Sequence, residues 1–314
     1  MSHPSSTRRG GIGPRSRGGL ALLLAATTLT LGACGVGPGE EEGNVRLLVT
    51  RDFGATQMSD ERPSLRADES VLGLLERNAS EVETAYGGGF VSSIDGWPRE
   101  NGDADPGDDG SRQDWFFFVN GSESQVGAAR YRPEPGDQVW WDMRDWQATA
   151  FTPAVVGAYP LPFSKQRRVG VDCRTGPAVC ESIRADLRVA GTRPVGSTDT
   201  EVRVLVGTWE ELRSDPVARL LEQSPERSGV YARFVRDEGI WKIAPYDATG
   251  EAAAGRVRGG LVAALRPTGG QVTWVLAGSV PASVPMGLRE ADLARRYATL
   301  LTLGGEDSVG LPVP

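Results

Sequence analysis

Residues 114–146 decide the fold of this chain, and they read DWFFFVNGSESQVGAARYRPEPGDQVWWDMRDW. Trp115 to Val119 is a run of apolar residues, mostly aromatic, which predicts a strand buried on both faces. Asn120-Gly121 follows directly, and because this dipeptide favours positive φ, it predicts a tight turn at the end of the strand. A second strand is predicted from Gln138 to Trp146.

The second predicted strand carries three tryptophans on alternating faces. Val139, Trp141 and Met143 share one face, whereas Trp140 and Trp146 share the other with Asp142 and Arg144. Because the second face mixes aromatic and charged side chains, we expect it to be partly exposed and the Trp141 face to be buried. Exposed aromatic side chains mark interaction sites, which makes Trp140 and Trp146 candidate ligand-binding residues.

The same stretch resembles a known bacterial family. Tyr131-Arg132-Pro133, then Gly136 and Trp146, are similar to the closing strands of the DUF4430 family, a domain of unknown function related to the C-terminal β-grasp domain of transcobalamin and intrinsic factor. Residues 115–121, 70–75 and 89–96 fit the other elements of that pattern in order. The resemblance implies a β-grasp domain over roughly residues 45–146. Because a core of this size does not need all of its aromatic side chains, Tyr131 is a further ligand-binding candidate.

The resemblance implies cobalamin as one candidate ligand among aromatic or amphipathic molecules. In the transcobalamin-like relatives, the β-grasp domain covers one face of a corrinoid, and an α/α barrel holds the other face. The remainder of this chain is too short and too rich in predicted strands for such a barrel. We therefore assign no cofactor, and a β-grasp fold alone does not define a ligand.

The N-terminus has the pattern of an export signal. Residues 1–33 contain four arginines and no acidic residue, and Leu20 to Leu31 is an apolar run too short to span a bilayer. The run ends in Leu31-Gly32-Ala33-Cys34, which resembles the bacterial lipobox. We expect a lipoprotein held at the extracytoplasmic face of the cell membrane by acylated Cys34; the alternative is an ordinary cleaved signal.

Composition excludes several function classes. The formal net charge is −7 for the whole chain and −11 without the arginines of residues 1–33, which argues against nucleic acid as a partner. The only histidine is His3, inside the leader, so histidine-based catalysis and histidine-ligated metals are excluded from the mature chain. Cys173 and Cys180 predict a disulfide in an exported protein; the alternative is a redox-active pair, although the spacing is not Cys-x-x-Cys.

The loop from Gly96 to Gly110 contains four aspartates between Asp103 and Asp109, so a calcium site has to be considered. The loop does not fit an EF-hand, because position six, where the motif needs Gly, is Pro106, and position twelve, where it needs Glu, is Arg112. We interpret the loop as a solvated insertion and assign no metal site. Trp97 either pins this loop to the core or is presented to a ligand, and it is kept as a ligand-binding candidate.

Composition shifts predict the domain organisation and an α+β fold class. We expect a signal peptide at 1–33, an acidic tether at 34–44, the β-grasp-like domain at 45–150, a proline-rich linker at 151–163 and a second, mixed α+β domain of unrecognised family at 164–305. In the second domain we expect a helix broken or kinked near Pro216, a closing helix over 288–301, and strands over 202–206, 230–235, 240–243, 261–265 and 272–276.

Three functions are compatible with this organisation. The first is a non-enzymatic binding module for a small ligand, with Trp97, Tyr131, Trp140 and Trp146 as its contacts. The second is a structural or protein-interaction lipoprotein, accessory to an envelope or transport complex. The third is an enzyme with paired carboxylates, such as a glycosidase. Because the context of the sequence singles out no acidic residue, we assign no catalytic residue and favour the first.

Overall fold

The structure is a computed structural model, and it describes residues 41–98, 112–165, 168–196, 200–289, 291–303 and 307–314. The predicted signal peptide, Cys34 and the loop from Asp103 to Asp109 lie outside these residues. Residues 38–314 form one compact unit, which contains all four hydrophobic clusters described below. The end of the expected acidic tether is instead a strand, β1 (Glu41–Asn44).

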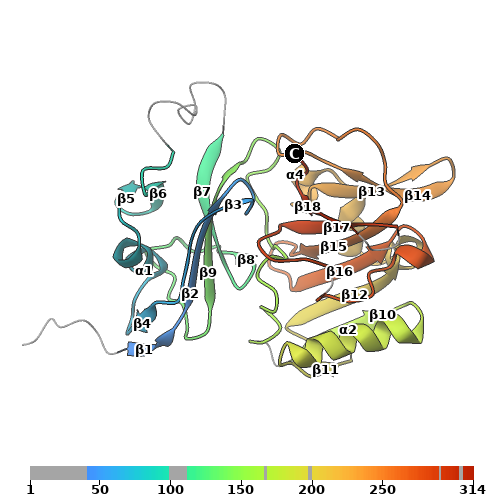
Figure 1. Cartoon of the computed structure of the whole chain (residues 1–314), viewed down its shortest axis with the longest axis horizontal. Coiled ribbons are helices and arrows are strands. Elements are labelled where there is room, and N and C mark those ends of the chain that lie inside the picture. Colours follow the sequence, from blue (N-terminus) through green and yellow to red (C-terminus); the bar gives the residue numbers. More distant parts are fainter. Residues whose placement is uncertain (1–40, 99–111, 166–167, 197–199, 290, 304–306) are drawn as a thin grey trace, which may run out of the picture. The chain divides into compact units, whose positions relative to one another are not determined.

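The first sheet has five strands in the order β3-β2-β9-β7-β8 (Figure 1). The central pair, β2 and β9, runs parallel, and every other pair is antiparallel. Both strands predicted from residues 114–146 are confirmed as β7 and β9, and the Asn120-Gly121 turn after β7 has both residues at positive φ. The strands are β2 (Arg46–Arg51), β3 (Thr56–Glu61), β7 (Gln113–Val119), β8 (Ser122–Glu123) and β9 (Gln138–Asp145).

One helix, α1 (Val71–Asn78), packs on the first sheet through Val71, Leu72, Leu74 and Leu75. Its N-cap is Ser70, whose hydroxyl accepts a hydrogen bond from the Gly73 N–H at 3.0 Å. Asp68 adopts a positive φ in the turn before the helix. Two small antiparallel pairs flank α1: β1 with β4 (Ser64–Arg66), and β5 (Val82–Ala85) with β6 (Phe90–Ile94).

The second sheet has seven strands in the order β11-β10-β12-β16-β15-β17-β18. The first four strands run parallel to one another, and each of the last three is antiparallel to the strand before it in this order. This arrangement confirms a mixed α+β architecture. Its strands are β10 (Val169–Cys173), β11 (Pro194–Val195), β12 (Val202–Thr208), β15 (Gly259–Leu265), β16 (Val272–Gly278), β17 (Ala298–Thr302) and β18 (Ser308–Leu311).

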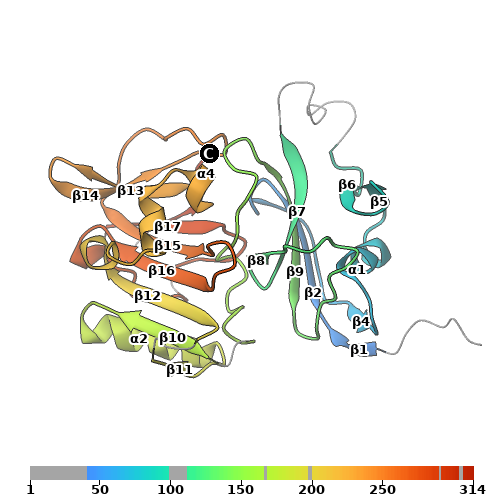
Figure 2. The ribbon, with the colours of Figure 1, turned by 180° about the vertical axis from the view of Figure 1, so that it is seen from behind.

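Both faces of the second sheet are covered. Helix α2 (Pro177–Val189) lies alongside β10 and β11 (Figure 2) and buries Ile183 and Leu187 against one face. Trp209 packs on the other face, together with the antiparallel hairpin of β13 and β14. The remaining elements are α3 (Trp209–Leu212), η1 (Ala218–Glu222), α4 (Pro225–Ser228), β13 (Ala232–Asp237), β14 (Ile240–Pro245) and η2 (Pro281–Ser283).

Three expectations for the second half need correction. The helix predicted over 288–301 is wrong: Asp292 and Arg295 have positive φ, and β17 pairs with both β15 and β18. The helix α2 was not anticipated, although Cys180, Ile183 and Leu187 have helical spacing. The proline-rich segment 151–163 is no open linker, because it is buried from Thr152 to Ala158. The break near Pro216 is confirmed between α3 and η1.

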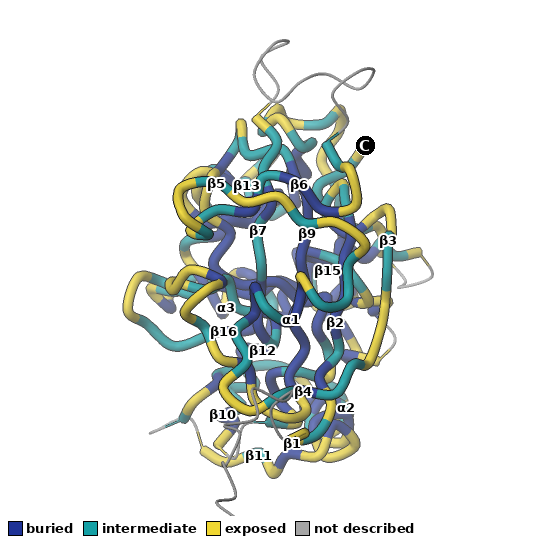
Figure 3. Tube along the Cα trace, turned by 90° about the vertical axis from the view of Figure 1, so that its left-hand side faces the viewer, coloured by how far each residue is buried: buried dark blue, intermediate teal, exposed yellow. Residues whose placement is uncertain are grey.

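Both faces of β9 are buried, as the dark tube in Figure 3 shows. Trp141 lies in the cluster shared with α1, as predicted. The other face was expected to be partly exposed, and this is wrong: Trp140 is 1% exposed and Asp142 is 0% exposed. That face is closed by Val155 and by Tyr297, which precedes β17, so the second half of the chain completes this core.

Two glycines allow the close approach that buries Trp140. A Cβ on Gly157 would lie 2.6 Å from the Arg296 nitrogen and 2.8 Å from the Trp140 ring. A Cβ on Gly54 would lie 2.0 Å from the Arg295 carbonyl oxygen. These contacts leave no space for a side chain between the first sheet and residues 295–297.

Candidate functional site

A cleft of about 430 Å³ lies between the first and second sheets, and we call it the Tyr131 cleft. One wall is the turn after β7 together with β8 and Tyr131. The opposite wall comes from the start of β12 and from the connection between β15 and β16. The lining residues that matter below are Glu123, Tyr131, Glu201, Arg266 and Gln271.

The first wall is held by the predicted turn at Asn120-Gly121. The Asn120 amide donates a hydrogen bond to Asp137 at 2.8 Å, and its oxygen accepts one from the Gln138 N–H at 2.9 Å. Lys165 forms an ion pair with Asp137 at 2.9 Å. The turn after β7 is therefore tied to the turn before β9, which fixes this wall without any contribution from a ligand.

Tyr131 is the predicted ligand-binding residue that lines a cavity. Its backbone carbonyl accepts the Val71 N–H at 3.0 Å, which fixes it to the first turn of α1. Its ring packs edge-on against Phe117, with 6.3 Å between the centroids. Burial, and then the negative charges of Asp137 and Glu134, raise the pKa of the Tyr131 phenol, while the positive charge of Arg266 opposes them. The phenol therefore stays protonated at neutral pH and can donate a hydrogen bond.

Glu123 contributes a carboxyl group to the cleft that the sequence did not single out. Its carboxylate accepts a hydrogen bond from the Thr152 N–H at 2.8 Å. Burial raises the pKa of Glu123 to about 7, against the opposing effects of the Arg144 charge and of the Thr152 hydrogen bond. Near neutral pH this group therefore exists in both forms and can donate or accept a proton in a hydrogen bond.

The opposite wall carries a cation and an amide. Arg266 follows the end of β15, and Gln271 precedes β16. The Gln271 amide donates to the Thr200 hydroxyl at 2.8 Å, and Glu201 accepts a hydrogen bond from the Arg168 backbone N–H at 3.3 Å. The cleft thus combines one aromatic ring with acidic, basic and amide groups. No signal in the sequence indicates that residues 123 and 266 line one cleft, because this arrangement depends on the approach of the two sheets.

The other predicted ligand residues do not meet in the cleft. Trp140 is enclosed in the core and donates a hydrogen bond from its indole to the Thr50 hydroxyl at 2.7 Å. Trp97 is half-buried against the α1 cluster, with the Arg51 guanidinium 3.5 Å from its ring centroid. Trp146 lies just beyond β9 with Arg112 over its ring at 5.2 Å. Trp97 itself thus packs against the core, and the loop that follows it lies outside the described residues.

A buried polar network joins the two sheets beneath Trp140. The Asp142 carboxylate accepts hydrogen bonds from the Thr50 hydroxyl, from the Gly54 N–H at 3.1 Å and from the Tyr297 hydroxyl at 2.9 Å. Burial raises the pKa of Asp142 to about 6, although these three donors favour the ionised form. Because Asp142 is fully enclosed, we assign it a structural role.

The disulfide predicted between Cys173 and Cys180 is confirmed, and it links the end of β10 to the first turn of α2. Within the described ranges, no group of three or more acidic, cysteine or histidine side chains is arranged to hold a metal ion. No helix of the described part is long and apolar enough to cross a membrane.

These features define an α+β protein with two sheets and a polar cleft that holds a half-buried acid and a tyrosine. Comparison with known families is consistent with the sequence: residues 68–145, from the turn before α1 to the end of β9, match the model of DUF4430, a domain of unknown function. The assignment of DUF4430 to this part of the chain is thereby confirmed. No curated protein matches the chain.

Among solved structures, the chain is similar to a proposed metal-binding protein from Ruminococcus gnavus. The sequence identity is 19% and the TM-score is 0.24, over 33% of this chain and 98% of that chain.

Proposed function

We propose that the chain is a membrane-anchored extracytoplasmic lipoprotein whose folded part is a non-enzymatic binding module. The anchor is supported by the basic leader, the short apolar run and the lipobox-like end at Cys34. The binding role is supported by the Tyr131 cleft, where a fixed aromatic side chain and several polar groups converge. This convergence is the single observation that carries the proposal.

The lining of the cleft favours an amphipathic ligand. An apolar or aromatic part of the ligand would lie against the Tyr131 ring. An amine or hydroxyl group would bond to Glu123, and an anionic or carbonyl group would bond to Arg266. The β-grasp resemblance of residues 45–146 adds cobalamin to the candidates, as a ligand and not as a resident cofactor.

The chemistry of the lining supports a non-enzymatic role. The mature chain has no histidine to act as a base, and both cysteines that follow Cys34 are consumed in the disulfide. Glu123 has a pKa near neutrality, but among the lining residues no serine, cysteine or lysine is hydrogen-bonded to it as a nucleophile. Its bond to the Thr152 N–H instead makes it part of the wall.

The ligand is tested by a thermal-shift screen of residues 38–314 against amphipathic aromatic compounds, with cobalamin included. Tyr131→Phe removes only the hydroxyl and Arg266→Gln only the charge, so both variants are expected to fold. We expect a compound that stabilises the parent to lose at least tenfold in affinity in each variant, since each loses a bond to a buried or charged group.

Tyr86→Ala is the matched control, because Tyr86 is 93% exposed and lies on the β5–β6 turn, outside the cleft lining. Equal binding by the parent, by both cleft variants and by the control would place the ligand elsewhere. If no compound binds and native purification instead yields a protein partner, the accessory lipoprotein of an envelope complex becomes the better description.

The anchor is tested separately with Cys34→Ala in the full chain. We expect this change to abolish metabolic lipid labelling and to remove the chain from the detergent phase in phase partitioning, since acyl chains provide the attachment. A variant that partitions like the parent contradicts the lipoprotein proposal and leaves the cleft proposal untouched.

A further inference from the structure

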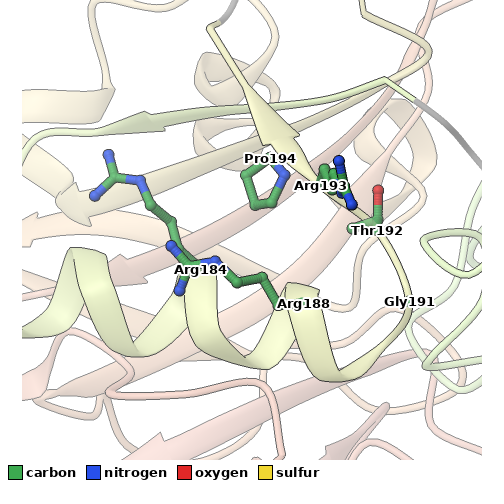
Figure 4. A pocket seen from close by; sticks show the side chains of 6 residues that line it. All are labelled: Arg184, Arg188, Gly191, Thr192, Arg193 and Pro194. Carbon is green, nitrogen blue, oxygen red and sulfur yellow. The ribbon is translucent and has the colours of Figure 1, made fainter.

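A second pocket, of about 530 Å³, lies between α2 and β11, and we call it the arginine pocket. Figure 4 shows Arg184 and Arg188 projecting from α2 on the side of Pro194, with Arg193 on the segment that leads into β11. The pocket therefore collects three guanidinium groups, in a chain whose mature part has a formal charge of −11.

Glu181 offsets part of this positive charge, because Arg188 and, more weakly, Arg184 lower the pKa of its carboxyl group. Arg188 forms an ion pair with Glu181 at 2.8 Å, but both side chains are more than half exposed. Within the part of the chain that the structure describes, Arg184 and Arg193 form no side-chain hydrogen bond or ion pair. Asp186 on the same helix is buried and accepts the Leu288 N–H at 2.8 Å, so it does not face the arginines.

Stabilisation of the helix explains only part of the cluster. Arg188 lies in the last turn of α2, where a cation complements the negative end of the helix dipole. Arg184 lies one turn earlier and Arg193 lies beyond the helix, so this effect does not account for them.

Two exposed apolar side chains adjoin residues of this pocket in the sequence. Val189, at the end of α2, is 70% exposed, and Val195, in β11, is 42% exposed. A surface that combines exposed apolar side chains with unpaired arginines matches the boundary of an anionic bilayer, where phosphate groups lie next to hydrocarbon.

The first described strand lies at the same end of the compact unit. Figures 1 and 3 both place β1, the first described strand, toward the end of the unit at which α2 and β11 lie. We propose that the arginine pocket and its two valines form a contact surface for the phosphate headgroups of an anionic lipid bilayer. The choice of a bilayer over another anion rests on the membrane anchor proposed above.

The test uses residues 38–314 without a lipid, so it does not depend on acylation of Cys34. Co-sedimentation is measured with vesicles of phosphatidylcholine alone and with vesicles that contain phosphatidylglycerol. We expect binding to the anionic vesicles only, and we expect it to weaken steeply as salt is raised from 0.05 M to 0.5 M, because exposed charges are screened.

The decisive variant is Arg184→Gln/Arg193→Gln, which removes two charges without breaking a side-chain hydrogen bond or ion pair of the described part of the fold. Each arginine near an anionic surface contributes about fivefold in affinity, so we expect a loss of about 30-fold. The matched control is Arg219→Gln/Arg227→Gln, which removes two exposed arginines from a different pocket and should bind like the parent. Circular dichroism verifies that both variants are folded.

Three outcomes would overturn the proposal. The first is no binding to anionic vesicles at low salt, and the second is an equal loss in both double variants, which would indicate a general charge effect. The third is saturable binding of inorganic phosphate at the arginines without a preference for anionic vesicles, which would indicate a free-phosphate site. Because lipid labelling at Cys34 is a separate measurement, failure here leaves the proposed anchor standing.

Discussion

Asp142 couples the stability of the protein to pH. Burial raises its pKa from the ordinary 3.8 to about 6, so the folded state binds a proton more tightly than the unfolded chain does. The contribution of this group to stability is complete below pH 4 and is lost as the pH rises through about 6. A shift of this size corresponds to about 2 to 3 kcal/mol.

We expect Asp142→Asn to reduce the fall in unfolding free energy between pH 4 and pH 6, because asparagine does not titrate. The amide can still accept from Thr50 and Gly54, so the variant should fold. Urea denaturation of residues 38–314 at several pH values measures the effect.

The matched variants are Glu123→Gln and Asp60→Asn. Glu123→Gln should likewise reduce the fall in unfolding free energy with rising pH, which for this group extends to about pH 7. A hydrogen bond from Arg46 lowers the pKa of Asp60, so Asp60 contributes stability that is lost as the pH falls, which is the opposite sign. An unchanged pH profile in Asp142→Asn would mean that this carboxyl is not enclosed.

At the residue scale, the sequence predicts what depends on local pattern. The cysteine pair and the Asn120-Gly121 turn could both be inferred from neighbours in the chain. The partners Tyr297 and Asp142 are 155 positions apart, and no spacing rule connects them. Glu123 is ordinary in sequence, and only burial beneath Thr152 gives it an unusual pKa.

At the scale of elements, substitutions in β9 test directly whether its Trp140 face is buried. Because Trp140 and Trp141 are 1% and 2% exposed, we expect Trp140→Ala and Trp141→Ala each to reduce the free energy of unfolding by about 3 to 5 kcal/mol. Urea denaturation followed by far-ultraviolet circular dichroism compares them. Trp146→Ala, beyond the end of the strand, should cost much less. A loss below 1 kcal/mol for Trp140→Ala would restore the expectation of an exposed face.

The sequence alone could not decide whether the Trp140 face of β9 is buried, for a physical reason. Alternation separates the faces of a strand, but a face that carries both tryptophan and aspartate fits either solvent or a polar contact with another element. The predicted helix over 288–301 failed similarly. Ala298, Leu300 and Leu301 fit a helical period, yet they form β17, which pairs with the open edge of β15. The strands of 114–146 were predictable because their apolar runs are long and end in strong turn signals.

At the scale of the whole molecule, the two sheets should unfold together. Phe53, Trp140 and Tyr297 form edge-to-face contacts of 5.1 to 5.7 Å across the junction, and the Asp142 network lies beneath them. We therefore expect one transition in urea, with the same midpoint by tryptophan fluorescence and by circular dichroism. Tyr297→Phe, which removes only the hydroxyl, should lower that midpoint for both probes alike.

Two separated transitions, or a Tyr297→Phe effect confined to one probe, would show that the sheets are independent. In that case the boundaries predicted at residues 150 and 164 would describe autonomous domains. A single transition would indicate that the boundary marks a change of sheet within one folding unit.

Tyr297 also sets the order in which the molecule can be completed during its synthesis. The first sheet ends at Asp145, but the ring that closes its second face, Tyr297, follows Asp142 by 155 positions in the chain. Until the ribosome has added Tyr297, the apolar face formed by Leu48, Phe118 and Trp140 is not fully covered. Long-range contacts of this kind form late in folding. A truncated product that stops before residue 297 would therefore expose an aromatic face, which makes unfinished chains prone to aggregation and open to proteolysis.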